Sequence, residues 1–222
     1  MNANTADTNQ LPEDIIQLEN MTTEQKILVA AEQEFLDKGF SGARTTAIAQ
    51  AAGVTHAMLH YYFRSKDKLF EKIITDKMSE LGKLMLDSLI TSNLPLFEKI
   101  RTIITGHLDF IGANPKLPFF FVREVYSNPE RMKLIADMLH THAEKSINRL
   151  QLEINEANAR GECRKVNAEM LILDIVSLNI FSFLAQPVLD TVLPELFSDK
   201  KRFLELRKKE NIETIMRKIK LG

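Results

Sequence analysis

The sequence predicts an all-α protein with two domains, and three observations support this class. Apolar residues recur mainly at helical spacing, whereas few segments alternate as a half-buried β-strand would. The eight Gly and seven Pro fall mostly between the periodic segments. With 222 residues, 45% of them hydrophobic, the chain suffices for a small N-terminal helical domain joined to a larger helical one.

The chain begins with a tail and a first helix. Residues 1–20 are rich in Asn, Thr and acidic side chains, so we expect a disordered tail. Thr22 or Thr23 can cap a helix whose apolar residues repeat every four positions from Ile27 onward. Gly39 is expected to end this helix, because glycine readily adopts the left-handed conformation found there.

Three more helices are expected in the N-terminal part. Thr45 can cap a second, short helix that ends at Gly53. Thr55 can cap a third helix and Ser65 a long fourth one. The expected ranges are about 45–52, 56–62 and 66–89. We therefore expect a first domain at residues 21–81 and a second at 82–222.

The second domain is expected to consist of long helices around an aromatic segment. The aromatic segment is Pro115 to Tyr126, and Gly161 is expected to break the chain between two of the helices. The helices are expected at about 95–113, 129–159, 167–186 and 200–219.

Composition argues against several classes of protein. The net charge of −1 gives no global field that would attract nucleic acid or an anionic membrane. The lone Cys163 excludes an internal disulfide and offers no paired-cysteine metal site. The N-terminus lacks the layout of a secretory signal, and the most apolar stretch, Met170 to Ala185, is shorter than the ~20 residues of a membrane span. We expect a cytoplasmic protein without membrane association.

Catalytic and cofactor-binding patterns are not visible either. We find no Ser-His-acid set, paired carboxylates or Gly-rich phosphate loop. His140 and His142 are two positions apart and would face different sides of one helix, so they do not form a metal site with His107. The sequence therefore predicts a protein that is not an enzyme and that has no cofactor or metal.

The most informative segment is residues 45–66, TTAIAQAAGVTHAMLHYYFRSK. It predicts two short helices joined by a tight turn at Gly53, with Ala49 and Ala52 small enough for close packing. In such a helix-turn-helix the first helix braces across the DNA backbone and the second enters the major groove. Val54 and Leu59 are expected to face the core of the domain, which leaves the polar side of the second helix free.

This segment resembles the tetracycline-repressor (TetR/AcrR) family of transcriptional regulators. The resemblance covers about residues 22–72 and is carried by Thr45, Ile48, Ala49, Ala52, Gly53, Val54, Thr55, Leu59, Tyr61, Tyr62, Phe63 and Lys66. It implies phosphate contacts from Thr45, Thr46 and Lys66. It also implies a groove-facing set comprising Thr55, His56, Met58, His60 and Tyr61. His60 stands where the family often has Tyr and Ala57 where it often has Gly, so the base preference does not follow from the resemblance.

The resemblance is weaker in the C-terminal half, where it implies a ligand cavity and a dimer interface. The residues expected around a cavity are His107, Phe110, Phe119, Phe120, Phe121, Tyr126, Met138, His142 and Phe181. The interface residues, on the helix after Asn167 and on the last helix, are expected to be Ile172, Val176, Ile180, Phe183, Ile212 and Ile215. For each of these residues a simple core position is an alternative.

Together these observations predict a homodimeric DNA-binding regulator, in the usual family mode a repressor, that recognises a near-palindromic double-stranded operator. A small hydrophobic or amphipathic ligand in the C-terminal domain would lower its DNA affinity. Two alternatives remain open: a helical carrier of a small molecule or lipid, and a DNA-binding protein of the same fold that a protein partner controls without any small-molecule ligand.

Overall fold

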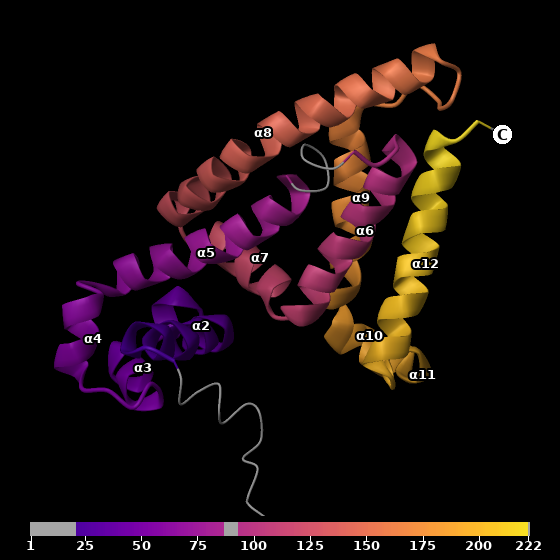
Figure 1. Cartoon of the computed structure of the whole chain (residues 1–222). Helices are drawn as coiled ribbons and strands as arrows, with labels where there is room; N and C mark the ends of the chain where they lie inside the picture. Colours follow the sequence, from indigo (N-terminus) through magenta and orange to yellow (C-terminus); the bar gives the residue numbers. More distant parts are fainter. Residues whose placement is uncertain (1–20, 87–92, 222) are drawn as a thin grey trace, which may run out of the picture. The chain divides into compact units, whose positions relative to one another are not determined.

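We describe the protein from a computed structural model, which covers residues 21–86 and 93–221, with only the backbone of residues 85, 86, 141 and 142 (Figure 1). The tail expected at residues 1–20 lies outside the described residues. Within these ranges every extended regular element is a helix, and the β-type pairing is limited to one isolated bridge between Cys163 and Lys220. The all-α prediction is confirmed.

The chain divides into two compact units, one ending at Ile73 and one beginning at Ile74. This division falls inside a single helix, α5, as does the boundary after residue 81 that we expected from the sequence. The functional limits 21–81 and 82–222 remain a prediction. We describe the two units separately.

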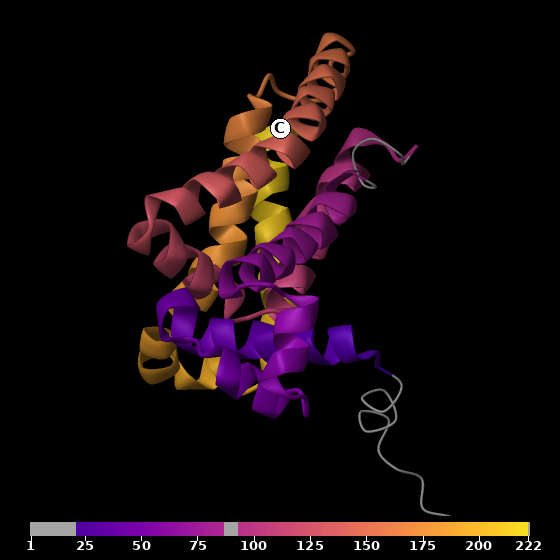
Figure 2. The same ribbon diagram turned by 90° about the vertical axis from the view of Figure 1, so that its left-hand side faces the viewer.

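The first unit contains α2 (Thr23–Gly42), α3 (Thr45–Ala51), α4 (His56–Tyr62) and the beginning of α5 (Lys66–Leu86), drawn in indigo to purple in Figures 1 and 2. A capping box starts α2: the Thr22 hydroxyl accepts from the Gln25 N–H at 3.2 Å, and the Gln25 side chain accepts from the Thr22 N–H at 2.8 Å. Gly39, at φ 70°, interrupts the helix as expected, and one short turn continues to Gly42.

The cap predictions of this unit are confirmed at three positions, Thr22, Thr55 and Ser65, and wrong at one. Thr55 and Ser65 accept from the N–H groups of Met58 and Lys68, both at 3.2 Å. Thr45, however, is the first helical residue of α3, and Arg44 precedes it without a capping side chain. The Thr45 hydroxyl instead bonds to a side chain of α4, an interaction between helices that local propensity cannot indicate.

An aromatic cluster closes the core of the first unit. The ring of Phe70 lies edge-on to Phe35 and Phe40, at centroid distances of 5.4 and 5.2 Å. Phe35 and Phe70 are almost completely buried, together with Ile27 of α2 and Leu59 of α4. Because such burial removes large apolar surfaces from water, this core holds the short helices α3 and α4 in place.

Within residues 74–86 and 93–221, the second unit contains the rest of α5 and seven further helices. Their ranges are α6 (Leu96–Ala113), α7 (Leu117–Ser127), α8 (Pro129–Ala159), α9 (Ala168–Leu184), α10 (Gln186–Val192), α11 (Pro194–Phe197) and α12 (Lys200–Ile219). The segment expected only as an aromatic stretch is the helix α7, and α10 and α11 were not predicted. In each of these three helices a proline occupies the first turn, where the backbone N–H has no partner within the helix and its absence therefore costs no hydrogen bond.

The core of this unit lies where α6, α9 and α12 pack against one another and against α8 (Figure 1). Ile100, Ile103 and Ile104 of α6 are fully buried there. A partly buried ion pair joins α6 to α8, with the Lys99 ammonium 2.7 Å from the Glu153 carboxylate, which also lies 2.8 Å from Arg149. The unit therefore has its own hydrophobic core.

No single helix of the described ranges is both long and apolar enough to cross a membrane. Helices α9 and α10 reach that length and composition only as a pair, and they are bent by 66° at the break between them.

Candidate nucleic-acid interface and ligand cavity

The turn between α3 and α4 is built by hydrogen bonds that require a left-handed residue. Gly53 has φ 67°, its N–H donates to the Gln50 carbonyl at 3.1 Å, and the Val54 N–H donates to the Ala49 carbonyl at 3.0 Å. These two bonds form a Schellman motif, which stops α3 and reverses the chain within two residues. The sequence therefore sets the angle at which α4 leaves the turn.

Helix α4 has one buried and one exposed side. Leu59 is completely buried, whereas Met58 is 41% and Tyr61 75% exposed. Thr55, His56 and His60 are also exposed, so the whole groove-facing set expected from the sequence lies at the surface of the first unit. A short helix with polar and aromatic side chains on its solvent side can enter a DNA major groove.

Two of the predicted DNA contacts also hold α3 and α4 together. The Nε2 atom of His56 lies 3.0 Å from the Thr45 hydroxyl. The imidazole of His60 stands edge-on to that of His56, with ring centroids 4.5 Å apart. Thr46, next to Thr45, is exposed. The pair Thr45–His56 therefore positions the first turn of α4 against the first turn of α3.

Lys66 is tied to its own unit. Its ammonium group donates to the Ala43 carbonyl at 2.7 Å and lies 4.6 Å from the centroid of the Phe40 ring. Two arginines that we did not single out from the sequence are exposed at the ends of the helix-turn-helix, Arg44 before α3 and Arg64 after α4. Their signal in the sequence is a positive charge directly flanking each end of the motif.

The second unit contains an apolar cavity of about 130 Å³. Residues of four helices, α5, α6, α8 and α9, line it. They are Met78, Leu81, Gly82, His107, Leu139, Ala143, Ser146, Ile147, Ile172 and Val176.

Of the nine residues expected around a cavity, the structure brings His107 to this one. Phe110 and Phe120 are buried, and Phe121 and Met138 are half-buried, but none of these four lines the cavity. The exposed members of the expected set are Phe119, Tyr126 and Phe181, at 58%, 87% and 66% exposure. The side chain of His142 lies outside the described residues.

A chain of buried hydrogen bonds ends at His107. The Asn211 amide donates to Oδ1 of Asn179 at 2.8 Å, and the Asn179 amide lies 3.0 Å from both the Ile104 carbonyl and Nδ1 of His107. His107, Asn179 and Asn211 are at most 4% exposed. Burial lowers the pKa of His107 to about 4, because the low-dielectric surroundings disfavour its charged form.

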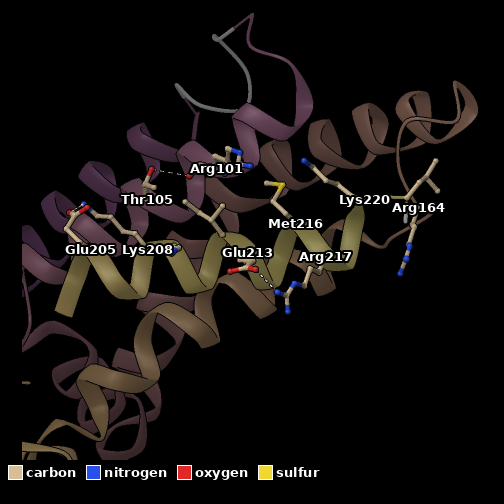
Figure 3. Close-up of a pocket in the computed structure, with 12 residues that line it drawn as sticks. Arg101, Thr105, Arg164, Glu205, Lys208, Glu213, Met216, Arg217 and Lys220 are labelled. Atoms are coloured by element: carbon tan, nitrogen blue, oxygen red, sulfur yellow. Dashed lines mark hydrogen bonds and ion pairs between the residues drawn. The ribbon is translucent and has the colours of Figure 1, made fainter. Parts of the chain in front are cut away.

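A larger groove runs along α12 at the surface of the same unit, with a volume of about 970 Å³ (Figure 3). Its walls carry six Lys or Arg side chains, among them Arg101, Lys208 and Arg217. Carboxylates compensate part of this charge: Lys208 lies 2.8 Å from both Asp109 and Glu205, and Arg217 pairs with Glu213. The smaller, apolar cavity is therefore the better candidate for a hydrophobic effector.

The residues expected at a dimer interface lie partly inside the single chain. Ile172 and Val176 line the apolar cavity, Phe183 and Ile215 are buried, and Ile180 and Ile212 are half-buried. A different side of α9 is exposed and apolar. It consists of Met170, Leu173 and Phe181, at 52%, 55% and 66% exposure, and we call it the α9 stripe.

Comparisons with known proteins agree with this geometry. Residues 27–73 match the family described as bacterial regulatory proteins, tetR family. The chain is 26% identical over 174 residues to the "Probable HTH-type transcriptional regulator YttP" of Bacillus subtilis. This alignment covers 78% of this chain and 83% of YttP. It is 35% identical over 120 residues to the regulator YdgC of the same organism, over 58% of the length of YdgC. These relatives are transcriptional regulators, which is not a class of enzymes.

Solved structures share the fold. The TetR family regulator PfmR of Thermus thermophilus aligns with a TM-score of 0.65 at 20% identity, over 91% of this chain and all of that one. The regulator FadR of Bacillus subtilis, in complex with stearoyl-CoA, aligns with a TM-score of 0.64 at 19% identity, over 86% of this chain and 96% of that one. The helix-turn-helix at residues 45–62, the family match around it and the similar regulators lead to one conclusion: residues 27–73 form a helix-turn-helix unit of the tetR family of bacterial regulatory proteins, and the chain as a whole is similar to transcriptional regulators.

Proposed function

We propose that the protein is a cytoplasmic, homodimeric repressor that binds a near-palindromic operator and releases it when a small apolar effector occupies the second unit. One observation carries the DNA-binding part of this proposal. The groove-facing side of α4 is exposed around Tyr61 while Leu59, two residues earlier, is fully buried. The recognition side chains are therefore held on a rigid support and need no rearrangement to reach base edges.

Backbone contacts around this helix would come from both ends of the motif. Thr46 and the guanidinium groups of Arg44 and Arg64 are exposed and can reach phosphates. Lys66, expected as a phosphate contact, already donates to the Ala43 carbonyl, so its main proposed role is to hold the chain between α2 and α3. Thr45 would similarly contribute through its bond to His56.

The dimer would form through the α9 stripe. Met170, Leu173 and Phe181 expose apolar surface at helical spacing, and Val188 of α10 continues it at 64% exposure. Exposed apolar side chains grouped on one side of a helix are typical of protein interfaces. Residues Ile180 and Ile212, half-buried beside this region, would contribute at its margin, whereas Ile215 and Phe183 would support it from inside.

The effector would act through α5. This helix starts four residues after α4 ends and supplies Met78, Leu81 and Gly82 to the cavity wall. A ligand that prefers one position of α5 would shift the population of DNA-binding conformations by its differential affinity. A protein of the same fold, FadR, is known in complex with stearoyl-CoA, which supports a small-molecule effector here.

The test of the proposal is a selection of bound sequences from random double-stranded DNA at two salt concentrations. Enrichment of one symmetric site at both concentrations is expected, because salt weakens phosphate contacts but not the base preference. The variant Tyr61→Ala should bind the selected site about 5- to 100-fold more weakly, as expected for the loss of base-edge contacts.

The matched control is Tyr126→Ala, which removes a tyrosine of similar exposure, 87% against 75% for Tyr61, from α7 of the second unit. It should bind the site as the wild type does, and circular dichroism should show both variants folded. Failure to enrich a symmetric site, or equal affinities of the two variants, would contradict the proposal.

A further inference from the structure

The apolar cavity of the second unit holds a defined polar group, the imidazole of His107. Nearly all its lining side chains are aliphatic, and the polar ones are His107 and Ser146. Among the described residues that line the cavity, none carries a formal charge at neutral pH, since Met78, Leu139 and their neighbours are apolar. A partly open site of this composition favours apolar molecules and disfavours ions, whose hydration its walls cannot replace.

The hydrogen-bond chain behind His107 determines which of its nitrogens carries the proton. The Asn179 amide nitrogen faces the Ile104 carbonyl at 3.0 Å, and a carbonyl can only accept. The same amide group must therefore donate to Nδ1 of His107, which lies at 3.0 Å and has to be the unprotonated nitrogen. The Asn211 amide donates to Oδ1 of Asn179 at 2.8 Å and so fixes the orientation of that amide.

A neutral imidazole with a bare Nδ1 has its proton on Nε2. Burial keeps the ring neutral, because the pKa of His107 is lowered to about 4. No hydrogen bond joins Nε2 to another described residue, and this atom is not one of the fully enclosed polar atoms that lack a partner, which are Arg123 Nε, Ser182 Oγ and Arg207 Nε. Nε2 therefore keeps some accessible surface, and a ligand in the cavity can accept a hydrogen bond from it.

We propose that this cavity selects an uncharged, largely apolar effector with one hydrogen-bond acceptor, such as a small ketone or ester, which accepts from the Nε2–H of His107. The proposal rests on the effector site described above and adds its chemical class. The volume of about 130 Å³ suits a molecule near the size of benzene, for which an apolar protein cavity of about 150 Å³ is known to suffice. Asn179 and Asn211 act as positioning residues that select the tautomer.

The proton position can be measured directly on the full-length protein. Long-range ¹H–¹⁵N NMR of the histidine rings at pH 7 should show His107 in the Nε2–H tautomer, with the signal assigned by its loss in His107→Phe. In Asn179→Leu the ring loses the donor to Nδ1, and the signal should change to a mixture of both tautomers. An Nδ1–H tautomer in the wild type, or an unchanged signal in Asn179→Leu, would overturn the proposal.

Binding is tested with two probes of similar shape, cyclohexanone, which has an acceptor, and methylenecyclohexane, which has none. Their affinity ratio is compared between variants, because the hydration of each probe is the same in every variant and cancels. The ratio should fall about 3- to 10-fold in His107→Phe, the change expected for one neutral hydrogen bond, and recover in part in His107→Gln, which retains a donor. A ratio that stays within about twofold in His107→Phe would overturn the proposal.

Two further measurements locate the probes and test the charge preference. Ala143→Leu adds volume inside the cavity and should abolish binding of both probes while the protein stays folded. Cyclohexanecarboxylate should bind at least tenfold more weakly than cyclohexanone, because the neutral His107 cannot pair with it. Binding of both probes to Ala143→Leu, no binding to the wild type, or a preference for the carboxylate would each overturn the proposal.

The outcome is separable from that of the DNA-binding proposal. His107→Phe without any probe should select the same operator as the wild type, since His107 lies in the second unit. An operator without the predicted probe ratio would refute the effector class alone. The predicted ratio and tautomer without an operator would refute the repressor function and leave the ligand site in place.

Discussion

The burial of His107 has a measurable consequence for stability. Its pKa is lowered to about 4 in the folded protein by burial, and an unfolded chain has the ordinary value of 6.5. Between these values the unfolded chain binds a proton that the folded protein does not. Folding stability from this group is therefore fully present above pH 6.5 and is lost as the pH falls toward 4.

The magnitude follows from the two pKa values. For one site with these values, lowering the pH from 7 to 5 should remove roughly 2 kcal/mol of unfolding free energy. The variant His107→Gln lacks the titrating ring but can still accept from the Asn179 amide. Its stability should therefore change less between the two pH values, by about the same 2 kcal/mol.

The assay is urea unfolding of wild type and His107→Gln at pH 7 and pH 5, followed by circular dichroism at one fixed protein concentration. The concentration is held constant because dimer formation contributes to the apparent stability. Subtracting the unfolding free energy of His107→Gln from that of the wild type at each pH removes the contributions of the other titrating groups, which the two proteins share. Parallel pH profiles, within about 0.5 kcal/mol, would show that His107 is protonated or solvated in the folded state and would refute the reasoning.

Three other substitutions test separate features. Gly53→Ala should cost about 1–2 kcal/mol of stability because of the left-handed backbone alone, since a Cβ there meets no atom within 4 Å; thermal unfolding checks this, and Gly42→Ala, without a positive φ, should cost less. Lys99→Met should cost about 1–2 kcal/mol, because the partly buried Glu153 loses its partner at 2.7 Å but keeps Arg149 at 2.8 Å; a loss below about 0.5 kcal/mol in urea unfolding would contradict this. Arg64→Gln should weaken binding to all DNA sequences alike and reduce the salt dependence by about one ion per half-site, as titrations at several salt concentrations would show.

Local sequence signals were sufficient for most helix boundaries. The caps Thr55 and Ser65, and the capping box of Thr22 and Gln25, involve residues three positions apart. The Schellman turn at Gly53 is equally local. Because these interactions form within one turn of the chain, residue type and spacing predict them without knowledge of the fold. The helix-turn-helix and the exposed side of α4 follow from them.

Signals that depend on a context beyond one turn were misread. No helix was predicted between residues 186 and 200, whereas Pro187 and Pro194 each lie in the first turn of a short helix, α10 or α11. Thr45 suggested a cap, but its hydroxyl bonds to His56, eleven residues away in another helix. For Thr45, the sequence indicated that the hydroxyl forms a hydrogen bond but not with which residue. For the two prolines, it did not indicate the short helices that begin there.

The sequence by itself determined the all-helical class, the helix-turn-helix and the side of α4 that faces solvent. Only the tertiary structure decided which side chains surround the cavity. His107, Leu139 and Val176 line the cavity together because α6, α8 and α9 converge there. Tyr126, which was also expected at the cavity because it is aromatic, is exposed instead. Helix periodicity reports that a residue has an apolar side, but the packing of distant helices selects its neighbours and decides whether a gap remains between them.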